Sequence, residues 1–437
     1  EGAALLEQVV GIAPDSMAAR NDLGAMLITL GRAEEALVQL QAAAALSPDS
    51  AEVQVNLGNA LHAQGSLETA EDIYRQALRL DPQHVRGLMS LGNLLYAVRR
   101  PADALGFLAA AAALAPESAP AHMFLGNALR DLVRIDEAVG SYRRALAIEP
   151  TNADTNENLG LILKAQGRLE EALACFRTSG NPYSRALALD CELRLGRPTD
   201  FFAYLEAHAA DEATNLHSAS LSAYASCAFG REDPHLFCPE PLAQVRVVDR
   251  YTNAGDAAFL EALIAEAGQV NVMWEPRGVT TKRGFQSGGN LFAHGYSALE
   301  KLHRDLVEEL QRYRAALAPP ALALATRWPE KMRLRGWYVR LLTGGHQNYH
   351  NHPFGWMSGC LYLQMPTAAP PGDGAIEFGL DSGDLPRLSD RPAPTLVKQP
   401  RPGQVVLFPS SLYHRTIPFH SDEERLCIAF DLLPEGT

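Results

Sequence analysis

The sequence predicts a multidomain protein in which an all-α repeat solenoid precedes a domain with a jelly-roll (double-stranded β-helix) core and flanking helices. Three features of the chain support this prediction. The first half repeats itself every 34 residues, the last third changes to short segments typical of strands, and several histidines gather beside those segments. We expect repeats over 1–186, a helical connector over 187–241 and a mixed domain over 242–437.

Length and composition indicate a folded, soluble protein. The chain has 437 residues, of which 47% are hydrophobic, so it can form two or more domains with full cores. Its net charge of −13 argues against a nucleic-acid partner bound through phosphates. No apolar run reaches the roughly 18–20 residues that span a bilayer. We expect no secretion signal, because the first residues lack a basic region followed by a hydrophobic core and a cleavage site. The six scattered cysteines form no C-x-x-C pair, which favours free thiols and a cytoplasmic protein.

A period of 34 residues governs the first half of the chain. Small residues allow two helices to cross closely, and proline ends a helix because it lacks an amide hydrogen. Each unit is therefore predicted to be one helical hairpin. Three sets of residues mark the period: the Leu-Gly pairs at Leu23, Leu57, Leu91, Leu125 and Leu159; Ala36, Ala70, Ala104, Ala138 and Ala172; and Pro14, Pro48, Pro82, Pro116 and Pro150.

These units resemble the tetratricopeptide repeat. Residues 1–16 are similar to the second helix of a further unit, so we expect the array to begin before residue 1. The five complete units follow one another at 17–50, 51–84, 85–118, 119–152 and 153–186.

The resemblance places position 9 of each unit on the concave wall of the array, where proteins of this kind commonly bind extended peptides. Three successive units have asparagine there, at Asn59, Asn93 and Asn127. Their side-chain amides suit the backbone of a bound peptide, which predicts a substrate groove. The alternative is that they are ordinary solvated polar residues of a scaffold.

A change of pattern near residue 242 marks the second domain. The period lapses after Gly180, although Ala- and Leu-rich helices continue to about residue 230 and a proline-rich run follows. Short antiparallel strands separated by Gly, Pro and Asp suggest a jelly-roll barrel. We expect helices at 254–269 and 297–317, strands at 332–342, 357–365, 374–378, 403–408 and 426–432, and one long loop at 367–402.

Three histidines have the spacing of a metal site. His350 and His352 form an i, i+2 pair near the end of a predicted strand, and His414 stands 64 residues after His350, beside another strand. A jelly roll can bring such a pair and a distal histidine to one face of a metal and leave other coordination positions open. The metal ligands are therefore predicted to be His350, His352 and His414.

An ordered set of segments fills the last third of the chain. It consists of residues 345–353 around the histidine pair, the strands at 358–362 and 403–410, and then His414 and Arg425. Together these segments resemble the superfamily of Fe(II)- and 2-oxoglutarate-dependent oxygenases, and more narrowly a branch in which some members carry N-terminal tetratricopeptide repeats. The resemblance spans about 240–434.

The resemblance implies a role for each residue of the set. His350 and His414 would bind Fe(II), and Arg425, eleven residues after His414, would hold the distal carboxylate of 2-oxoglutarate. Ser358 and Tyr362 share one face of a strand, where a hydroxyl near 2-oxoglutarate is expected. Simple core packing is an equal alternative for Tyr362.

His352 departs from the family pattern, which has a carboxylate at this position. A face of three histidines still suits Fe(II), so His352 is expected to complete the set. Glu377, on the predicted strand at 374–378, is the alternative ligand if His352 points away.

The implied enzyme is a dioxygenase that uses Fe(II), 2-oxoglutarate and O₂ to hydroxylate its substrate. A repeat groove fused to a catalytic barrel favours a peptide or protein substrate that the groove delivers. Two alternatives remain. One is an oxygenase that acts on a free small molecule and uses the repeats for assembly, and the other is an inactive binding or scaffold protein, which the altered His-x-His pair would fit. No nucleic-acid or membrane partner is expected.

Overall fold

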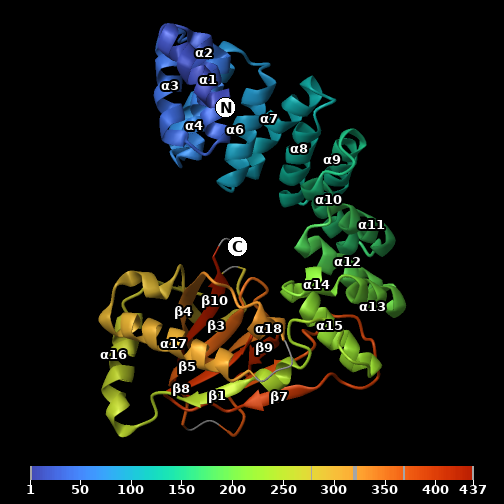
Figure 1. Cartoon of the computed structure of the whole chain (residues 1–437), viewed down its shortest axis with the longest axis vertical. Helices are drawn as coiled ribbons and strands as arrows, with labels where there is room; N and C mark the ends of the chain where they lie inside the picture. Colours follow the sequence, from blue (N-terminus) through green and yellow to red (C-terminus); the bar gives the residue numbers. More distant parts are fainter. Residues whose placement is uncertain (1, 277, 318–321, 368–369, 436–437) are drawn as a thin grey trace. The chain divides into compact units, whose positions relative to one another are not determined.

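The computed structural model divides the chain into two compact units, Glu1–Gly180 and Asn181–Thr437 (Figure 1). It describes residues 2–276, 278–317, 322–367 and 370–435. The first unit is helical and the second joins helices to a curled antiparallel sheet, so the predicted fold classes are confirmed. In these ranges, no helix combines the length and the apolar character needed to cross a bilayer.

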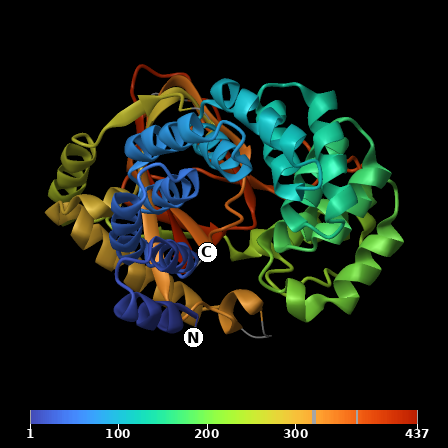
Figure 2. The same ribbon diagram turned by 90° about the horizontal axis from the view of Figure 1, so that it is seen from above.

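The first unit is a row of helical hairpins, and Figure 2 shows its blue to teal helices following an arc. Every period proline stands two residues after the end of a helix, as predicted. The helices are α1 (Gly2–Ile12), α2 (Met17–Thr29), α3 (Ala33–Leu46), α4 (Ala51–Ala63), α5 (Leu67–Leu80), α6 (Val85–Ala97), α7 (Pro101–Leu114), α8 (Ala119–Asp131), α9 (Ile135–Ile148), α10 (Ala153–Ala165) and α11 (Leu169–Ser179).

The glycines of the period lie where the two helices of a hairpin touch. A Cβ added at Gly58 would stand 2.5 Å from the Tyr74 ring, and one at Gly126 would stand 2.6 Å from the Tyr142 ring. Such distances are shorter than van der Waals contact, so a larger residue would push the helices apart. Close packing of the two helices therefore explains why a glycine recurs every 34 residues.

Four helices open the second unit: α12 (Pro182–Arg194), α13 (Pro198–Ala207), α14 (Ala209–Glu212) and α15 (Leu216–Phe229). The buried carboxylate of Glu212 on α14 links α12 to α15, because it accepts hydrogen bonds from Arg185, Asn215 and Ser218 at 2.5–2.8 Å. The helices expected in the connector thus belong to the same compact unit as the sheet.

The sheet of the second unit is antiparallel, with the strand order β1-β8-β5-β10-β4-β9-β6-β7, and β3 joins β2 to β4. Its strands are β1 (Arg246–Asp249), β2 (Val272–Trp274), β3 (Thr281–Ser287), β4 (Met332–His350), β5 (Met357–Gln364), β6 (Ile376–Gly379), β7 (Thr395–Lys398), β8 (Gln404–Pro409), β9 (Tyr413–Thr416) and β10 (Arg425–Pro434). The helical segments are η1 (Pro241–Gln244), η2 (Ala254–Asp256), α16 (Ala257–Ala267), η3 (Leu291–His294), α17 (Ser297–Ala315) and α18 (Ala323–Thr326).

Two predictions about the strands were wrong. The strand expected to end at 342 continues to His350, because β3 and β9 pair with the segment beyond Gly344 and Gly345. The segment 367–402 is not one loop, since it contains the β6–β7 hairpin; its residues 368–369 lie outside the described residues. The strands β1, β2, β3, β7 and β9 were not predicted, because they are short and have no long apolar run.

Apolar side chains cover both faces of the curled sheet. One cluster packs helices α16 and α17 against the outside, through residues such as Leu263, Leu302 and Leu361. The other fills the inside of the curl, through residues such as Val339, Phe378 and Phe408. The three predicted metal ligands lie at the edge of this inner cluster.

Candidate metal centre and co-substrate pocket

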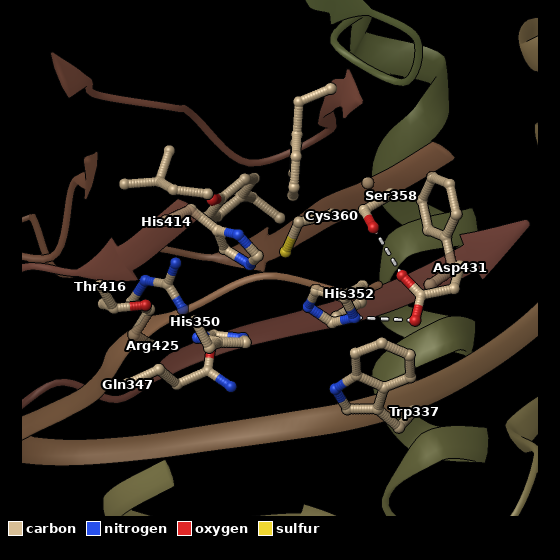
Figure 3. Close-up of a pocket in the computed structure, with 16 residues that line it drawn as sticks. Trp337, Gln347, His350, His352, Ser358, Cys360, His414, Thr416, Arg425 and Asp431 are labelled. Atoms are coloured by element: carbon tan, nitrogen blue, oxygen red, sulfur yellow. Dashed lines mark hydrogen bonds and ion pairs between the residues drawn. The ribbon is translucent and has the colours of Figure 1, made fainter. Parts of the chain in front are cut away.

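The structure brings the three predicted histidine ligands together. His350 ends β4 and is the strand partner of His414 on β9, while His352 follows two residues after His350. The candidate ligand atoms of the three residues all lie within 4.8 Å of one another. Figure 3 shows the rings converging from two strands and one loop.

Each ring has an acceptor at its Nδ1 atom. Nδ1 of His350 lies 2.7 Å from the carbonyl oxygen of Asn348, and Nδ1 of His414 lies 3.4 Å from that of Leu412. Nδ1 of His352 lies 2.8 Å from the Asp431 carboxylate. Acceptors on the far side of the ring fix the proton at Nδ1 and leave Nε2 to bind a metal, as in most histidine-ligated sites.

Burial keeps two of these rings neutral. It lowers the pKa of His350 to about 4, and the neighbouring His352 adds to this effect. Burial also holds the pKa of His414 well below its usual range, with His350 as a further cause. Only the neutral ring has a free nitrogen lone pair, so both residues are ready to bind a metal at neutral pH.

Arg425 is a buried cation in the same pocket, with only 1% of its surface exposed. Its Nε donates to the carbonyl oxygen of Gly374 at 3.0 Å, and one terminal nitrogen lies 3.4 Å from Sγ of Cys427. Among the described residues it has no carboxylate partner. Burial alone would lower its pKa, but the neighbouring Cys427 and Tyr362 side chains outweigh this effect and raise it. A buried charge of this kind needs an anion.

The hydroxyl of Tyr362 is the second open group. It is buried and, within the described part of the chain, has no hydrogen-bond partner. The Arg425 guanidinium lies 4.9 Å from the centre of its ring. Burial raises the pKa of Tyr362, so its hydroxyl stays protonated and can donate to an anion. Together the two residues fit one end of a dicarboxylate.

Ser358 also lines the pocket, but its hydroxyl is already engaged. It donates to the carboxylate of Asp431 at 2.6 Å and lies 2.7 Å from the hydroxyl of Ser410. Asp431 was not predicted from the sequence. An acidic residue inside the apolar run at 426–432 was the available signal.

Glu377 is not part of the histidine cluster. Its carboxylate pairs with Arg415 at 2.5 Å, and its strand neighbours Ile376 and Phe378 face the inner core. Alternation along β6 therefore points Glu377 to the opposite face. The alternative prediction, in which Glu377 is a metal ligand in place of His352, was therefore wrong.

The predicted groove residues lie in the first unit. Oδ1 of Asn59 accepts hydrogen bonds from the hydroxyls of Tyr74 at 2.7 Å and Ser90 at 3.0 Å. Oδ1 of Asn127 accepts from the Tyr142 hydroxyl at 2.7 Å in the same way. Asn93 has no such bond among the described residues, because Leu108 takes the place of the tyrosine.

Comparison with solved structures finds several proteins of similar fold. YrrB, described as a TPR protein with an unusual peptide-binding site, is 21% identical, with 40% of this chain and 91% of that chain covered and a TM-score of 0.33. MamA of Desulfovibrio magneticus RS-1 is 23% identical, with 37% and 92% covered and a TM-score of 0.34. PilF of Pseudomonas aeruginosa is 19% identical, with 51% and 99% covered and a TM-score of 0.43. No curated protein matches the chain.

Comparison with protein families separates the two parts of the chain. Four tetratricopeptide-repeat profiles match residues 1–51, 27–128, 126–167 and 157–178. Residues 335–431 match the family described as "Putative 2OG-Fe(II) oxygenase", and this segment contains the three histidines and Arg425. The resemblance predicted from the sequence is thus confirmed for these segments: the first part of the chain matches tetratricopeptide repeats, and residues 335–431 match this oxygenase family.

Proposed function

We propose that the second unit is an Fe(II)- and 2-oxoglutarate-dependent dioxygenase that hydroxylates a peptide or protein bound by the repeats. One observation carries the proposal. Among the described residues, a single pocket contains three imidazoles with free Nε2 atoms, a buried guanidinium without a carboxylate partner and a buried hydroxyl without a hydrogen-bond partner. The first group fits a divalent metal, and the other two fit the distal carboxylate of 2-oxoglutarate.

The residues of the pocket divide the work. His350, His352 and His414 would hold the metal on one face and leave its other positions open. Arg425 and Tyr362 would fix the co-substrate, and the apolar inner core would keep water away from both. Bound iron would supply the oxidation of a C–H bond, coupled to conversion of 2-oxoglutarate and O₂ to succinate and CO₂.

The repeat unit supports a peptide or protein as the substrate. The tyrosine hydroxyls donate to Oδ1 of Asn59 and Asn127, which fixes these side chains and leaves each Nδ2 group to donate elsewhere. Two such donors, 68 residues or two units apart, suit the carbonyl oxygens of an extended chain.

The test uses the full chain under anaerobic conditions. Calorimetry should show one Fe(II) site and then one 2-oxoglutarate site that depends on the metal. After oxygen is admitted, mass spectrometry of a peptide library should find products heavier by one oxygen atom, with succinate in equal amount. A chain that binds metal but no 2-oxoglutarate contradicts the enzyme class. Turnover of small molecules with no peptide product contradicts only the substrate.

A further inference from the structure

The three candidate metal ligands include no carboxylate, but the carboxylate of Asp431 lies next to one of them. Asp431 stands on β10, and its two oxygens have different partners. Oδ2 lies 2.8 Å from Nδ1 of His352, and Oδ1 accepts from the hydroxyl of Ser358 at 2.6 Å (Figure 3). Ser358 in turn lies 2.7 Å from the hydroxyl of Ser410. The carboxylate is thus held from both sides.

Within the described part of the chain, no cation other than a charged His352 could balance the charge of Asp431. Only 8% of its surface is exposed, and among the described residues its one possible ionic partner is His352. Burial of an unpaired carboxylate is costly, so an acidic residue at this position needs a positive neighbour. An imidazole that binds a divalent metal is such a neighbour, since the metal draws electrons from the ring and strengthens the Nδ1–H donor.

The other contacts of His352 keep its ring in one orientation. The Trp337 ring stacks on it with 5.6 Å between ring centres and 16° between planes. Its backbone nitrogen donates to the carbonyl oxygen of Ser410 at 2.9 Å. With Nδ1 turned to Asp431, Nε2 is the ring nitrogen left for a metal, and the candidate ligand atoms of His350, His352 and His414 lie within 4.8 Å of one another. The His352 tautomer and the ring direction therefore depend on the same carboxylate.

We infer that Asp431 is a positioning residue of the metal centre. It holds His352 with the proton on Nδ1 and Nε2 toward the metal, and it supplies through this ring the negative charge that three neutral histidines do not provide. The inference rests on the proposed function, because it assumes a metal at the histidines. It assigns the charge of the missing carboxylate ligand to a residue 79 positions further along the chain.

The first test needs no variant. Zn(II) is diamagnetic, so long-range ¹H–¹⁵N NMR can follow the His352 ring in the zinc-loaded full chain. A protonated Nδ1 with a strongly downfield proton is expected both without and with zinc. If Asp431 bound the metal directly, this hydrogen bond would be lost on zinc addition, and the inference would be overturned.

The second test replaces two acidic residues of the same sheet, one at a time, and measures the affinity for Co(II) and Zn(II) by calorimetry. Asp431→Asn should weaken metal binding about 10- to 100-fold, the usual effect of removing such a partner, and should shift the His352 signals in the metal-free protein. Glu377→Gln removes a carboxylate that pairs with Arg415 and should change the affinity less than about twofold.

The outcomes separate the two proposals. If the wild-type chain binds no metal, the proposed function and this inference both fail. If the wild-type chain binds metal and Asp431→Asn binds it within twofold of the same affinity, only the role of Asp431 fails. Thermal unfolding followed by circular dichroism shows whether the variant is folded, and the zinc NMR experiment on the wild-type chain decides the matter if it is not.

Discussion

The two units differ in how completely their buried polar atoms are paired in hydrogen bonds. Among the described residues of the repeat unit, one buried side-chain atom lacks a hydrogen-bond partner, Nδ1 of His122. The described part of the second unit leaves several such atoms, including the hydroxyl of Tyr362, and gives its buried Arg425 no carboxylate partner. Unpartnered buried groups destabilise a fold, so a protein retains them where a ligand completes them. In the second unit, the Tyr362 hydroxyl is such an atom, and it lies in the pocket of the three histidines, where a ligand would complete it.

Hydrogen-bond partners in the two units also differ in how many residues separate them along the chain. Tyr74 reaches Asn59 over 15 residues, whereas Asp431 reaches His352 over 79. In the repeats, neighbouring helices satisfy one another, and each unit contacts the next. In the barrel, strands from distant parts of the sequence meet. The site in the second unit therefore depends on the whole sheet, and single changes there should have larger effects on ligand binding.

The largest effect is expected at the metal ligands. Replacement of both His350 and His414 by alanine should lower Fe(II) affinity at least about 100-fold, because two of three ligands are lost. Anaerobic calorimetry and metal content after dialysis measure it. His346→Ala is the matched control, since that ring bonds to the carbonyl oxygen of Gly344 and lies outside the cluster. Equal metal content in the double variant would place the metal elsewhere.

The second effect tests whether the repeats bind the substrate. Replacement of Asn59, Asn93 and Asn127 by alanine should weaken peptide turnover roughly 10- to 1,000-fold, because each hydrogen bond contributes about 0.5–1.5 kcal/mol. Uncoupled 2-oxoglutarate consumption should not change. Steady-state kinetics with each substrate separates the two.

The single changes sharpen this prediction. Asn59→Ala and Asn127→Ala should each have a larger effect than Asn93→Ala, because tyrosine hydroxyls fix only the first two side chains. Equal effects of all three would mean that the tyrosines do not orient the donors. No effect of the triple variant would favour the small-molecule substrate.

The third effect concerns the co-substrate. Arg425→Ala should raise the Kd for 2-oxoglutarate at least about tenfold, since a charged hydrogen bond contributes roughly 1.5–3 kcal/mol when water is excluded. Arg425→Lys keeps the charge but not the paired donors and should fall in between. Arg340→Ala is the control, because that side chain pairs with Glu424 and does not line the pocket. Iron binding should survive in all three, and unchanged 2-oxoglutarate affinity in Arg425→Ala would contradict the assignment.

The smallest effect is a pH dependence at Cys427. A hydrogen bond from the Cys360 thiol lowers the pKa of Cys427 to about 7, and the charge of Arg425 acts in the same direction. Without co-substrate, we therefore expect a thiolate to form beside Arg425 as the pH rises through about 7. A bound carboxylate adds a second anion and raises this pKa, so binding takes up a proton.

The affinity for 2-oxoglutarate should consequently fall as the pH rises above 7, by at most about tenfold per pH unit. Calorimetry at pH 6.5, 7.5 and 8.5 measures it, and Cys427→Ser should remove the slope. The same slope in this variant would assign the titration to another group.

The sequence predicted the repeat unit closely and the barrel in part. The period marked the helix ends of the first unit because its contacts are local, as between Gly58 and Tyr74. In the barrel it predicted the apolar strands β5, β8 and β10. It also predicted the three histidines, two of which form a short motif while the third lies further along the chain. It missed short strands such as β9. It also missed the role of Asp431: the acidic residue stands out in its apolar run, but no spacing in a single sequence reveals that its cross-strand partner is His352.

The position of α15 bears on where the chain can be cut. Ser220 on this helix donates to the carbonyl oxygen of Ser411, near His414, and accepts from the side chain of Asn351, between His350 and His352. One serine hydroxyl thus links the two segments that carry the candidate metal ligands. A fragment that starts at the proline-rich run near 232 would lose this tie, whereas one that starts at Asn181 would keep it. We expect an N-terminal truncation series to show a sharp loss of metal affinity when its start passes residue 220.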